Sequence, residues 1–236
     1  DVPALRANMS PDAVARHDLV VARLTQLEQS STGAKATKWS MDGAVNGSLT
    51  PNADTGISCI SFAAVATATV LGIENTQDSG TFCVFGTADK FIAQFQHVNA
   101  DGSTESVLKD RLSTRDPDYF RVMNENVLKN GAAVYVCQAY RKDSEGSGEH
   151  PAHSFIVANT GDGWFVYEST PPTTRKIPFD KKMQQNYSHV DFFEVTPDPL
   201  PAGESYVAYA NRSRPDIVVS RSGSVEAVEV KPPTTN

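Results

Sequence analysis

The chain has 236 residues, of which 39% are hydrophobic and 21% charged, and its formal net charge is -7 at pH 7. These values are typical of an ordinary globular protein of one large domain or two small ones, whose core needs neither a disulfide nor a metal ion. A surface that binds nucleic-acid phosphates needs clustered Lys and Arg, which this acidic sequence lacks. No apolar run approaches the about 20 residues that span a bilayer.

The first predicted element is an amphipathic helix that begins at Ser10 and ends near Gln29. Ser10 supplies a capping hydroxyl, Pro11 suits the first helical position and Asp12 complements the positive helix N-terminus. Apolar residues then recur at helical spacing. After this helix, Asp-Gly and Asn-Gly pairs within residues 38–50 predict a short irregular hairpin.

A second helix is predicted from Cys59 to about Leu71, after a turn rich in Pro, Asn, Asp and Gly. Ser58 or Thr55 can cap its start, and Gly72 suits the left-handed position that follows a helix. Nearly every residue of the segment is apolar or small, so we expect this helix at the centre of the protein.

Two more helices are predicted between residues 87 and 131. One begins at Thr87 and runs amphipathically to Val98. The other begins at the Asp-Pro-Asp stretch of residues 116–118 and stops at Asn130 and Gly131.

After residue 131 the sequence changes to short runs rich in β-branched and aromatic residues, separated by turn signals. Strands are predicted at 132–140, 153–159, 163–169, 174–179 and 189–195. The fold class predicted is α+β, with a helical N-terminal half and a central helix packed on an antiparallel sheet. We interpret residues 1–196 as this domain and residues 197–236 as a linker followed by a C-terminal β-hairpin extension.

Three residues in this arrangement suggest nucleophilic catalysis. Cys59 stands at a helix start, where the helix dipole favours the thiolate and unpaired N–H groups can bind an oxyanion. His153 heads a strand and can act as the base, while Glu168 ends the returning strand and can orient the imidazole. The simpler interpretations are a buried packing thiol for Cys59 and a solvent-facing strand end for Glu168.

The order of these segments resembles the papain-like cysteine peptidases and amidases, in the broad sense that includes the NlpC/P60 group. The resemblance covers roughly residues 51–196 and implies a papain-like fold with Cys59 as nucleophile, His153 as general base and Glu168 as the orienting residue. Papain-like enzymes usually carry a glutamine about six residues before the cysteine as an oxyanion donor. Here Asn52 is a weak substitute, and backbone amides are the better candidates.

The other histidines and cysteines carry weaker signals. His17 and His97 are interpreted as surface or packing residues within helices, and His189 is an alternative base. Cys83 and Cys137 lie in strand-like context, which is compatible with a disulfide in an oxidising compartment or with two reduced thiols.

Metal-dependent chemistry is disfavoured by the spacing of the potential ligands. His150 and His153 are separated by a proline and lack an accompanying pair of cysteines, so no metal site is predicted, and no cofactor. Asp216, Glu229 and Lys231 follow the order of PD-(D/E)xK nucleases, but too few residues follow to complete such a core, and we interpret the match as chance.

The functional hypothesis is a thiol-dependent hydrolase that cleaves an amide bond through an acyl-enzyme, with peptide, protein or peptidoglycan substrates implied by the resemblance. Glutamine deamidation, acyl transfer and non-catalytic binding on the same fold are alternatives. We expect no nucleic-acid partner and no membrane span, leave the oligomeric state open, and expect a secreted or periplasmic protein whose signal peptide is absent or already removed.

Overall fold

The computed structural model describes residues 6–29, 59–73, 95–109, 111–140, 153–170, 173–179, 187–209 and 218–220. Its helices are α2 (Pro11–Gln29), α5 (Cys59–Val70) and α7 (Tyr119–Asn130). Its strands are β1 (Phe95–Val98), β2 (Thr104–Ser106), β3 (Arg111–Ser113), β4 (Ala133–Tyr140), β5 (His153–Asn159), β6 (Trp164–Thr170), β7 (Thr173–Pro178), β8 (His189–Glu194), β9 (Ser205–Tyr209) and β10 (Val218–Ser220).

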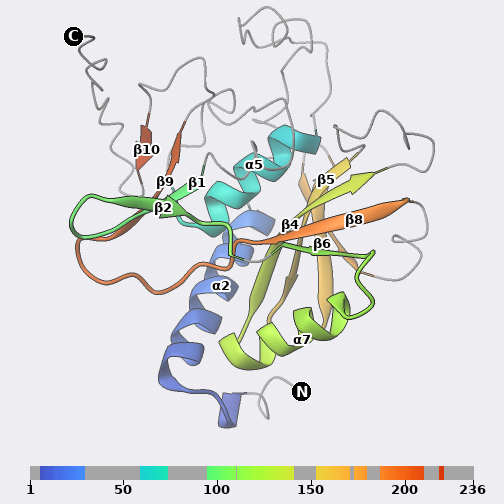
Figure 1. The fold of residues 1–236 in the computed structure, drawn as a ribbon, viewed down its shortest axis with the longest axis horizontal. Coiled ribbons are helices and arrows are strands. Elements are labelled where there is room, and N and C mark those ends of the chain that lie inside the picture. The colour runs from blue at the N-terminus through green and yellow to red at the C-terminus, as the bar shows by residue number, and fades with distance from the viewer. Residues whose placement is uncertain are drawn as a thin grey trace, which may run out of the picture.

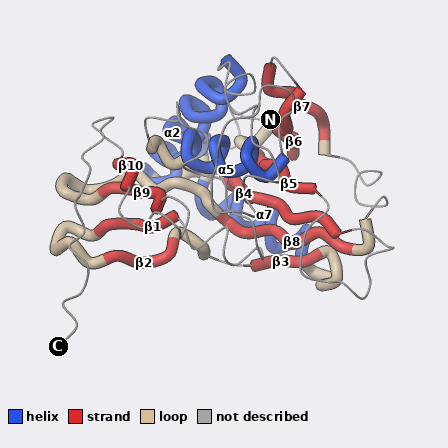
Figure 2. The backbone as a smooth tube through the Cα atoms, turned by 90° about the horizontal axis from the view of Figure 1, so that it is seen from above, coloured by secondary structure: helices blue, strands red, loops and turns tan. Residues whose placement is uncertain are grey.

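The strands form two antiparallel sheets that lie side by side (Figures 1 and 2). The larger sheet has six strands in the order β3-β8-β4-β5-β6-β7, and the smaller has four in the order β10-β9-β1-β2. The mixture of helices with antiparallel sheets makes the protein an α+β protein, as predicted. Within the described residues, β1, β2 and β3 accompany α2 and α5 in the N-terminal half, so that half is not wholly helical.

Both faces of the six-stranded sheet are covered. Along β4 and β5, Val136 and Ile156 belong to one core cluster with residues of α2 and α5, whereas Tyr135 and Val157 belong to another with residues of α7. Successive side chains of a strand point to opposite faces, so α2 and α5 lie on one face and α7 on the other. A sheet buried on both sides explains why β4 is apolar along most of its length.

The helix ends follow from local chemistry. The backbone N–H of Ala13 donates to Ser10 Oγ over 3.2 Å, which caps α2. α7 ends at Gly131, whose φ of 81° is left-handed, and Gly72 after α5 has a φ of 72°. Glycine adopts these angles without the steric penalty of a Cβ atom. The predicted bounds of all three helices agree with the structure to within three residues.

The helix predicted from Thr87 to Val98 is wrong over its last four residues. Phe95–Val98 is the strand β1, which pairs with β2 on one side and β9 on the other. These pairings override the apolar spacing that suggested a helix. Residues 74–94, which hold the rest of that prediction, lie outside the described residues.

Two predictions near the ends of the chain are only partly covered. Strand β9 was not predicted; it follows the proposed linker and pairs with β1. Strand β10 falls within the predicted terminal hairpin and pairs with β9, and the rest of that hairpin lies outside the described residues, as does the hairpin of residues 38–50. In the part of the chain that is described, no helix has the length and apolarity needed to cross a membrane.

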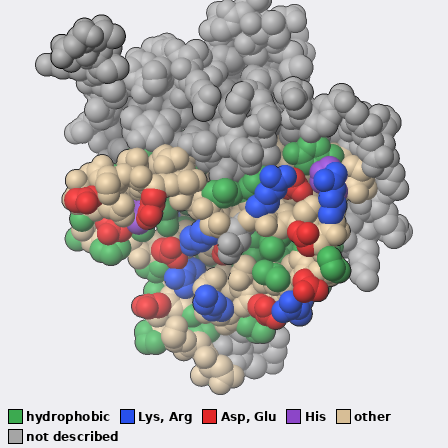
Figure 3. Space-filling model, viewed as in Figure 1, with side chains coloured by type: hydrophobic (Ala, Val, Ile, Leu, Met, Phe, Trp, Pro, Cys, Tyr) green, Lys and Arg blue, Asp and Glu red, His purple; other side chains and the backbone are tan. Residues whose placement is uncertain are grey.

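Charged side chains of both signs are interspersed over the described part of the face seen in Figure 3. Some of this mixture is local pairing: on α7, Arg121 bonds Glu125 over 2.6 Å and Asp118 over 3.0 Å. Such exposed pairs contribute little to stability, because water and salt screen the attraction between the charges. The fold is therefore held mainly by the two apolar clusters on either side of the large sheet.

Candidate active site

Cys59 is the first residue of α5, and its side chain is partly exposed. The helix behind it consists of small and apolar residues, and Phe62, Ala63 and Ala66 are fully buried. α5 packs against β5 and β6. The sequence thus builds a buried helix whose N-terminus, the positive end of its dipole, carries a thiol at the protein surface.

His153 is the first residue of β5, where it pairs across the sheet with Ala139 of β4. Strand β5 then leads into a tight turn, in which Asn159 Oδ1 accepts hydrogen bonds from the N–H groups of Gly161 and Gly163. Both glycines have positive φ, of 102° and 114°, which few other residues adopt. This turn sends β6 back beside β5, so its far end returns to the level of His153.

Glu168, near the end of β6, contacts the imidazole directly. Its Oε2 lies 3.1 Å from His153 Nε2, and the two side chains are 17% and 27% exposed. The second partner of the imidazole is Cys59, whose side chain is hydrogen-bonded to His153. Because Nε2 is engaged by Glu168, Nδ1 is the nitrogen left for the sulfur.

The contact between sulfur and imidazole is made at the end of the sheet. By alternation along β5, His153 shares a face with Phe155, and the two rings have centroids 5.4 Å apart. That face is opposite to the one covered by α5. Cys59 and His153 are the first residues of α5 and β5, so they stand at the end of the sheet. There a side chain from the helix on one face can contact a side chain from the other face.

The charges of this cluster favour a protonated imidazole. Burial lowers the pKa of His153, but hydrogen bonds and charge attraction from Cys59 and then Glu168 outweigh it and raise the pKa to about 9. The interaction is mutual: an imidazolium beside the sulfur stabilises a thiolate at Cys59, as does the helix N-terminus. The geometry thus fits a thiolate and imidazolium pair held by a carboxylate.

The structure brings together the three residues that sequence reasoning selected for catalysis: Cys59, His153 and Glu168. Asn52, the weak oxyanion candidate, lies outside the described residues, as does His150. His189, the alternative base, starts β8 and stacks on Tyr140 with ring centroids 4.3 Å apart.

Sequence reasoning missed a row of buried polar side chains next to His153. Ser154, Gln138 and Asp191 stand opposite one another on β5, β4 and β8, and each is at most 2% exposed. The only available signal was a polar residue within each apolar strand. The row lies on the face of the sheet that α5 covers, because Gln138 alternates with Val136 and Ser154 with Ile156.

Two other histidines have structural partners. His17 on α2 is 5% exposed, with Nδ1 3.1 Å from Asp18 Oδ1 and Nε2 3.1 Å from the carbonyl oxygen of Thr160, so it is a packing residue that joins α2 to the β5–β6 turn. His97 was predicted in a helix and lies instead in β1, with Nδ1 3.0 Å from Glu105 and Nε2 2.8 Å from Glu204.

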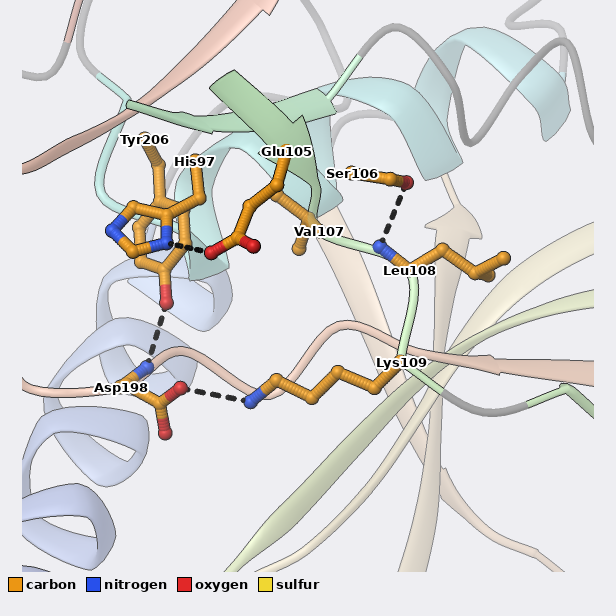
Figure 4. Close-up of a pocket in the computed structure, with 8 residues that line it drawn as sticks. All are labelled: His97, Glu105, Ser106, Val107, Leu108, Lys109, Asp198 and Tyr206. Atoms are coloured by element: carbon orange, nitrogen blue, oxygen red, sulfur yellow. Dashed lines mark hydrogen bonds and ion pairs between the residues drawn. The ribbon is translucent and has the colours of Figure 1, made fainter. Parts of the chain in front are cut away.

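A pocket of about 280 Å³ opens beside His97, lined by the small sheet and by the connecting segments that hold Lys109 and Asp198 (Figure 4). Its charged groups are already paired with one another. Lys109 Nζ lies 3.0 Å from Asp198, and Arg16 binds the same carboxylate over 2.8 Å. Burial alone would raise the pKa of Asp198, but the cation of Lys109, with Arg16, brings it below its usual range. Because these charged groups already bind one another, the pocket does not indicate the charge or class of a ligand.

The remaining chemical candidates do not form a second site among the described residues. Cys137 is a free thiol, and its burial raises its pKa well above the usual range, which makes it unreactive. Cys83 and the nuclease-like residues Asp216, Glu229 and Lys231 lie outside the described residues. In the described ranges, no three potential ligands from His, Cys, Asp and Glu gather around one point.

Comparisons with protein-family models, with curated proteins and with solved structures gave no match for this chain. The chemistry of Cys59, His153 and Glu168 must therefore carry the functional inference.

Proposed function

We propose that this protein is a thiol-dependent hydrolase that cleaves an amide bond, with Cys59 as nucleophile, His153 as general acid and base, and Glu168 as the positioning residue. One observation carries the proposal: a partly exposed cysteine at a helix N-terminus is hydrogen-bonded to a histidine whose Nε2 lies 3.1 Å from a carboxylate oxygen. A nucleophile, a base and an orienting group in contact are the arrangement that activates a weak nucleophile.

In the proposed reaction, the Cys59 thiolate attacks the carbonyl carbon of the scissile amide. A carbon–sulfur bond forms, and the π electrons of the carbonyl move to its oxygen. The N–H groups of the first turn of α5 have no partner within the helix, and they stabilise this oxyanion. The tetrahedral intermediate then expels the amine, which takes the proton held by His153.

The second half of the reaction regenerates the thiol. His153, now neutral, removes a proton from a water molecule that attacks the thioester carbonyl. The acid leaves, and the thiolate and imidazolium form again. Glu168 keeps the ring oriented through both halves by accepting the hydrogen bond from Nε2.

The proposed substrate class is a peptide, an isopeptide or the peptide part of peptidoglycan, and the proposed fold family is papain-like. Support comes from the order of the elements: a buried helix that begins with the cysteine, a later strand that begins with the histidine, and an adjacent antiparallel strand that supplies the carboxylate. That order matches the resemblance found in the sequence.

Alkylation kinetics test the activated thiol. Iodoacetamide is reacted with the protein across a pH series, and the labelled cysteine is located by mass spectrometry. We expect Cys59 to react rapidly below pH 7, whereas the rate for an ordinary thiol falls about tenfold per pH unit below its pKa of about 8.5. His153→Ala should abolish this advantage, and His97→Ala, which removes a histidine bound to Glu105 and Glu204 in the small sheet, should keep it.

Cys137 serves as the internal control, because it is a free but buried thiol of the same chain. If Cys59 labels as slowly as Cys137 at every pH, the thiol is not activated, and the protein is a binding protein rather than a hydrolase.

Product analysis tests the bond that is cleaved. Denatured casein and purified peptidoglycan are incubated with the protein, and new primary amines and ammonia are measured separately. Release of amines that is lost in Cys59→Ala supports hydrolysis of a peptide bond. Release of ammonia alone would identify deamidation in its place.

A further inference from the structure

The side-chain amide of Gln138 is buried and only half satisfied. Gln138 is 1% exposed, and its Oε1 accepts a hydrogen bond from Ser154 Oγ over 2.7 Å. Within the described part of the chain, nothing accepts a hydrogen bond from its NH₂ group. Buried polar groups in folded proteins are nearly always hydrogen-bonded, so a donor left over in the interior calls for a specific explanation, such as a bound water or a catalytic role.

The position of this amide relates it to the candidate active site. Gln138 stands opposite Ser154, and Ser154 directly follows His153 in β5. The amide therefore lies one row from the imidazole at the same end of the sheet, on the face covered by α5. Cys59, which touches His153, is the first residue of that helix.

Ser154 fixes the direction of the amide. Its hydroxyl donates to Oε1, so Oε1, and not the NH₂ group, is the end of the amide that faces the Ser154 side chain. Asp191 stands opposite Gln138 on the other side, but its Oδ2 is bound to Arg111 over 2.5 Å. The donor is thus held in place before any ligand arrives, which is the condition under which a hydrogen bond stabilises a transition state most effectively.

We propose that Gln138 is a further catalytic residue of this site, whose side-chain N–H donates to the carbonyl oxygen of the substrate as Cys59 attacks. The inference rests on the proposed function. As the carbon–sulfur bond forms, the π electrons move onto the carbonyl oxygen, and the amide N–H shares that negative charge with the N–H groups of α5. When the amine leaves with the proton from His153, the C=O bond is restored and the hydrogen bond weakens. The amide is neither protonated nor consumed.

The test compares two reactions of the same sulfur. Acylation by p-nitrophenyl acetate passes through an oxyanion, whereas alkylation by iodoacetamide displaces iodide and forms none. Both rates are measured for the wild-type protein and for Gln138→Met, which keeps the approximate shape without the amide. Gln138→Glu is a second variant that retains the shape but not the NH₂ group. Thr196→Val is the matched control, since Thr196 is fully buried and hydrogen-bonded to the other end of β4.

We expect Gln138→Met to slow acylation of Cys59 by about 10²–10³-fold, the usual effect of removing one oxyanion donor, while alkylation changes by less than about twofold. Thermal unfolding monitored by circular dichroism confirms that the variants are folded. If Gln138→Met does not fold, Gln138→Glu decides the matter by the same ratio of rates.

Three results would overturn the inference. If both rates are unchanged, the amide holds an internal water. If both rates fall together, Gln138 supports the contact between Cys59 and His153 and does not bind the oxyanion. If the wild-type thiol is alkylated rapidly but never forms a thioester, the proposed hydrolase function fails as well, and this outcome is distinguished from the first two by the wild-type protein alone.

Discussion

Replacing Cys59 with alanine should lower the pKa of His153. The pKa of about 9 exceeds the ordinary value of 6.5 by about 2.5, which corresponds to roughly 3 kcal/mol in favour of the protonated ring. This is a net figure, because burial opposes it. Cys59 is the larger of the two favourable partners, so its removal should cost the imidazolium the larger share of that figure, on the order of 2 kcal/mol.

The assay is an NMR titration of the histidine ring protons, with His153 assigned by its loss in His153→Gln. Cys59→Ala removes the charged sulfur and leaves Glu168, so His153 should release its proton at a clearly lower pH than in the wild-type protein. Cys137→Ala removes a buried thiol of β4 and should leave the titration unchanged. Identical His153 curves in Cys59→Ala and wild type would refute the contact on which the candidate site depends.

Two more predictions concern the carboxylate and the packing of α7. Glu168→Gln keeps a hydrogen-bonding oxygen but removes the charge. A hydrogen bond to a charged group is worth about 1.5–3 kcal/mol, so alkylation of Cys59 at about pH 6 should slow by about tenfold or more; an unchanged rate would mean that Glu168 is only a surface acid. Gly131→Ala places a Cβ 2.4 Å from the carbonyl oxygen of Ala13, whereas Gly102→Ala meets nothing within 4 Å at a similar positive φ. Chemical denaturation should show a loss of about 1 kcal/mol for Gly102→Ala and clearly more for Gly131→Ala, and equal losses would show that the residue after α7 does not lie against the first turn of α2 at Ala13.

The three helices and the strands β4 to β8 of the large sheet are predictable because their signals are local, whereas β3, with three residues, was not predicted. Ser10 and Pro11 start α2, Gly131 ends α7, and the glycines around the β5–β6 turn separate two apolar runs. Each of these signals acts within a few residues of the chain. Such local signals predict a helix or strand correctly when the element is long enough to show its periodic pattern of apolar residues.

The small sheet is not predictable in this way. β2 has three residues, all exposed, so it shows no apolar alternation. β1 pairs with β9, whose residues are far away in the sequence, and its own spacing suggests a helix. Strand pairing between distant segments is a property of the folded chain, and short strands carry too few residues to record it in their composition.

In the candidate site too, some residues could be predicted from the sequence and one could not. Cys59, His153 and Glu168 each stand at the beginning or near the end of an element, and their chemistry stands out from apolar neighbours, so order along the chain was enough to select them. Gln138 could not be selected, because the significance of its amide lies in its burial and in the single bond to Ser154. Both depend on which strands pair and on what covers them.

The two partners of His153 imply a change of role during the proposed reaction. Before attack, the thiolate of Cys59 and the carboxylate of Glu168 together keep the imidazole protonated, which prepares it to supply a proton to the leaving amine. Once the sulfur is acylated, its negative charge is gone and Glu168 alone opposes the effect of burial. The ring then releases its proton more readily, and a neutral imidazole is what the attacking water needs. The chemistry of the first half-reaction therefore converts the acid into the base of the second, and Cys59→Ala reproduces the electrostatic condition of the acyl-enzyme without any substrate.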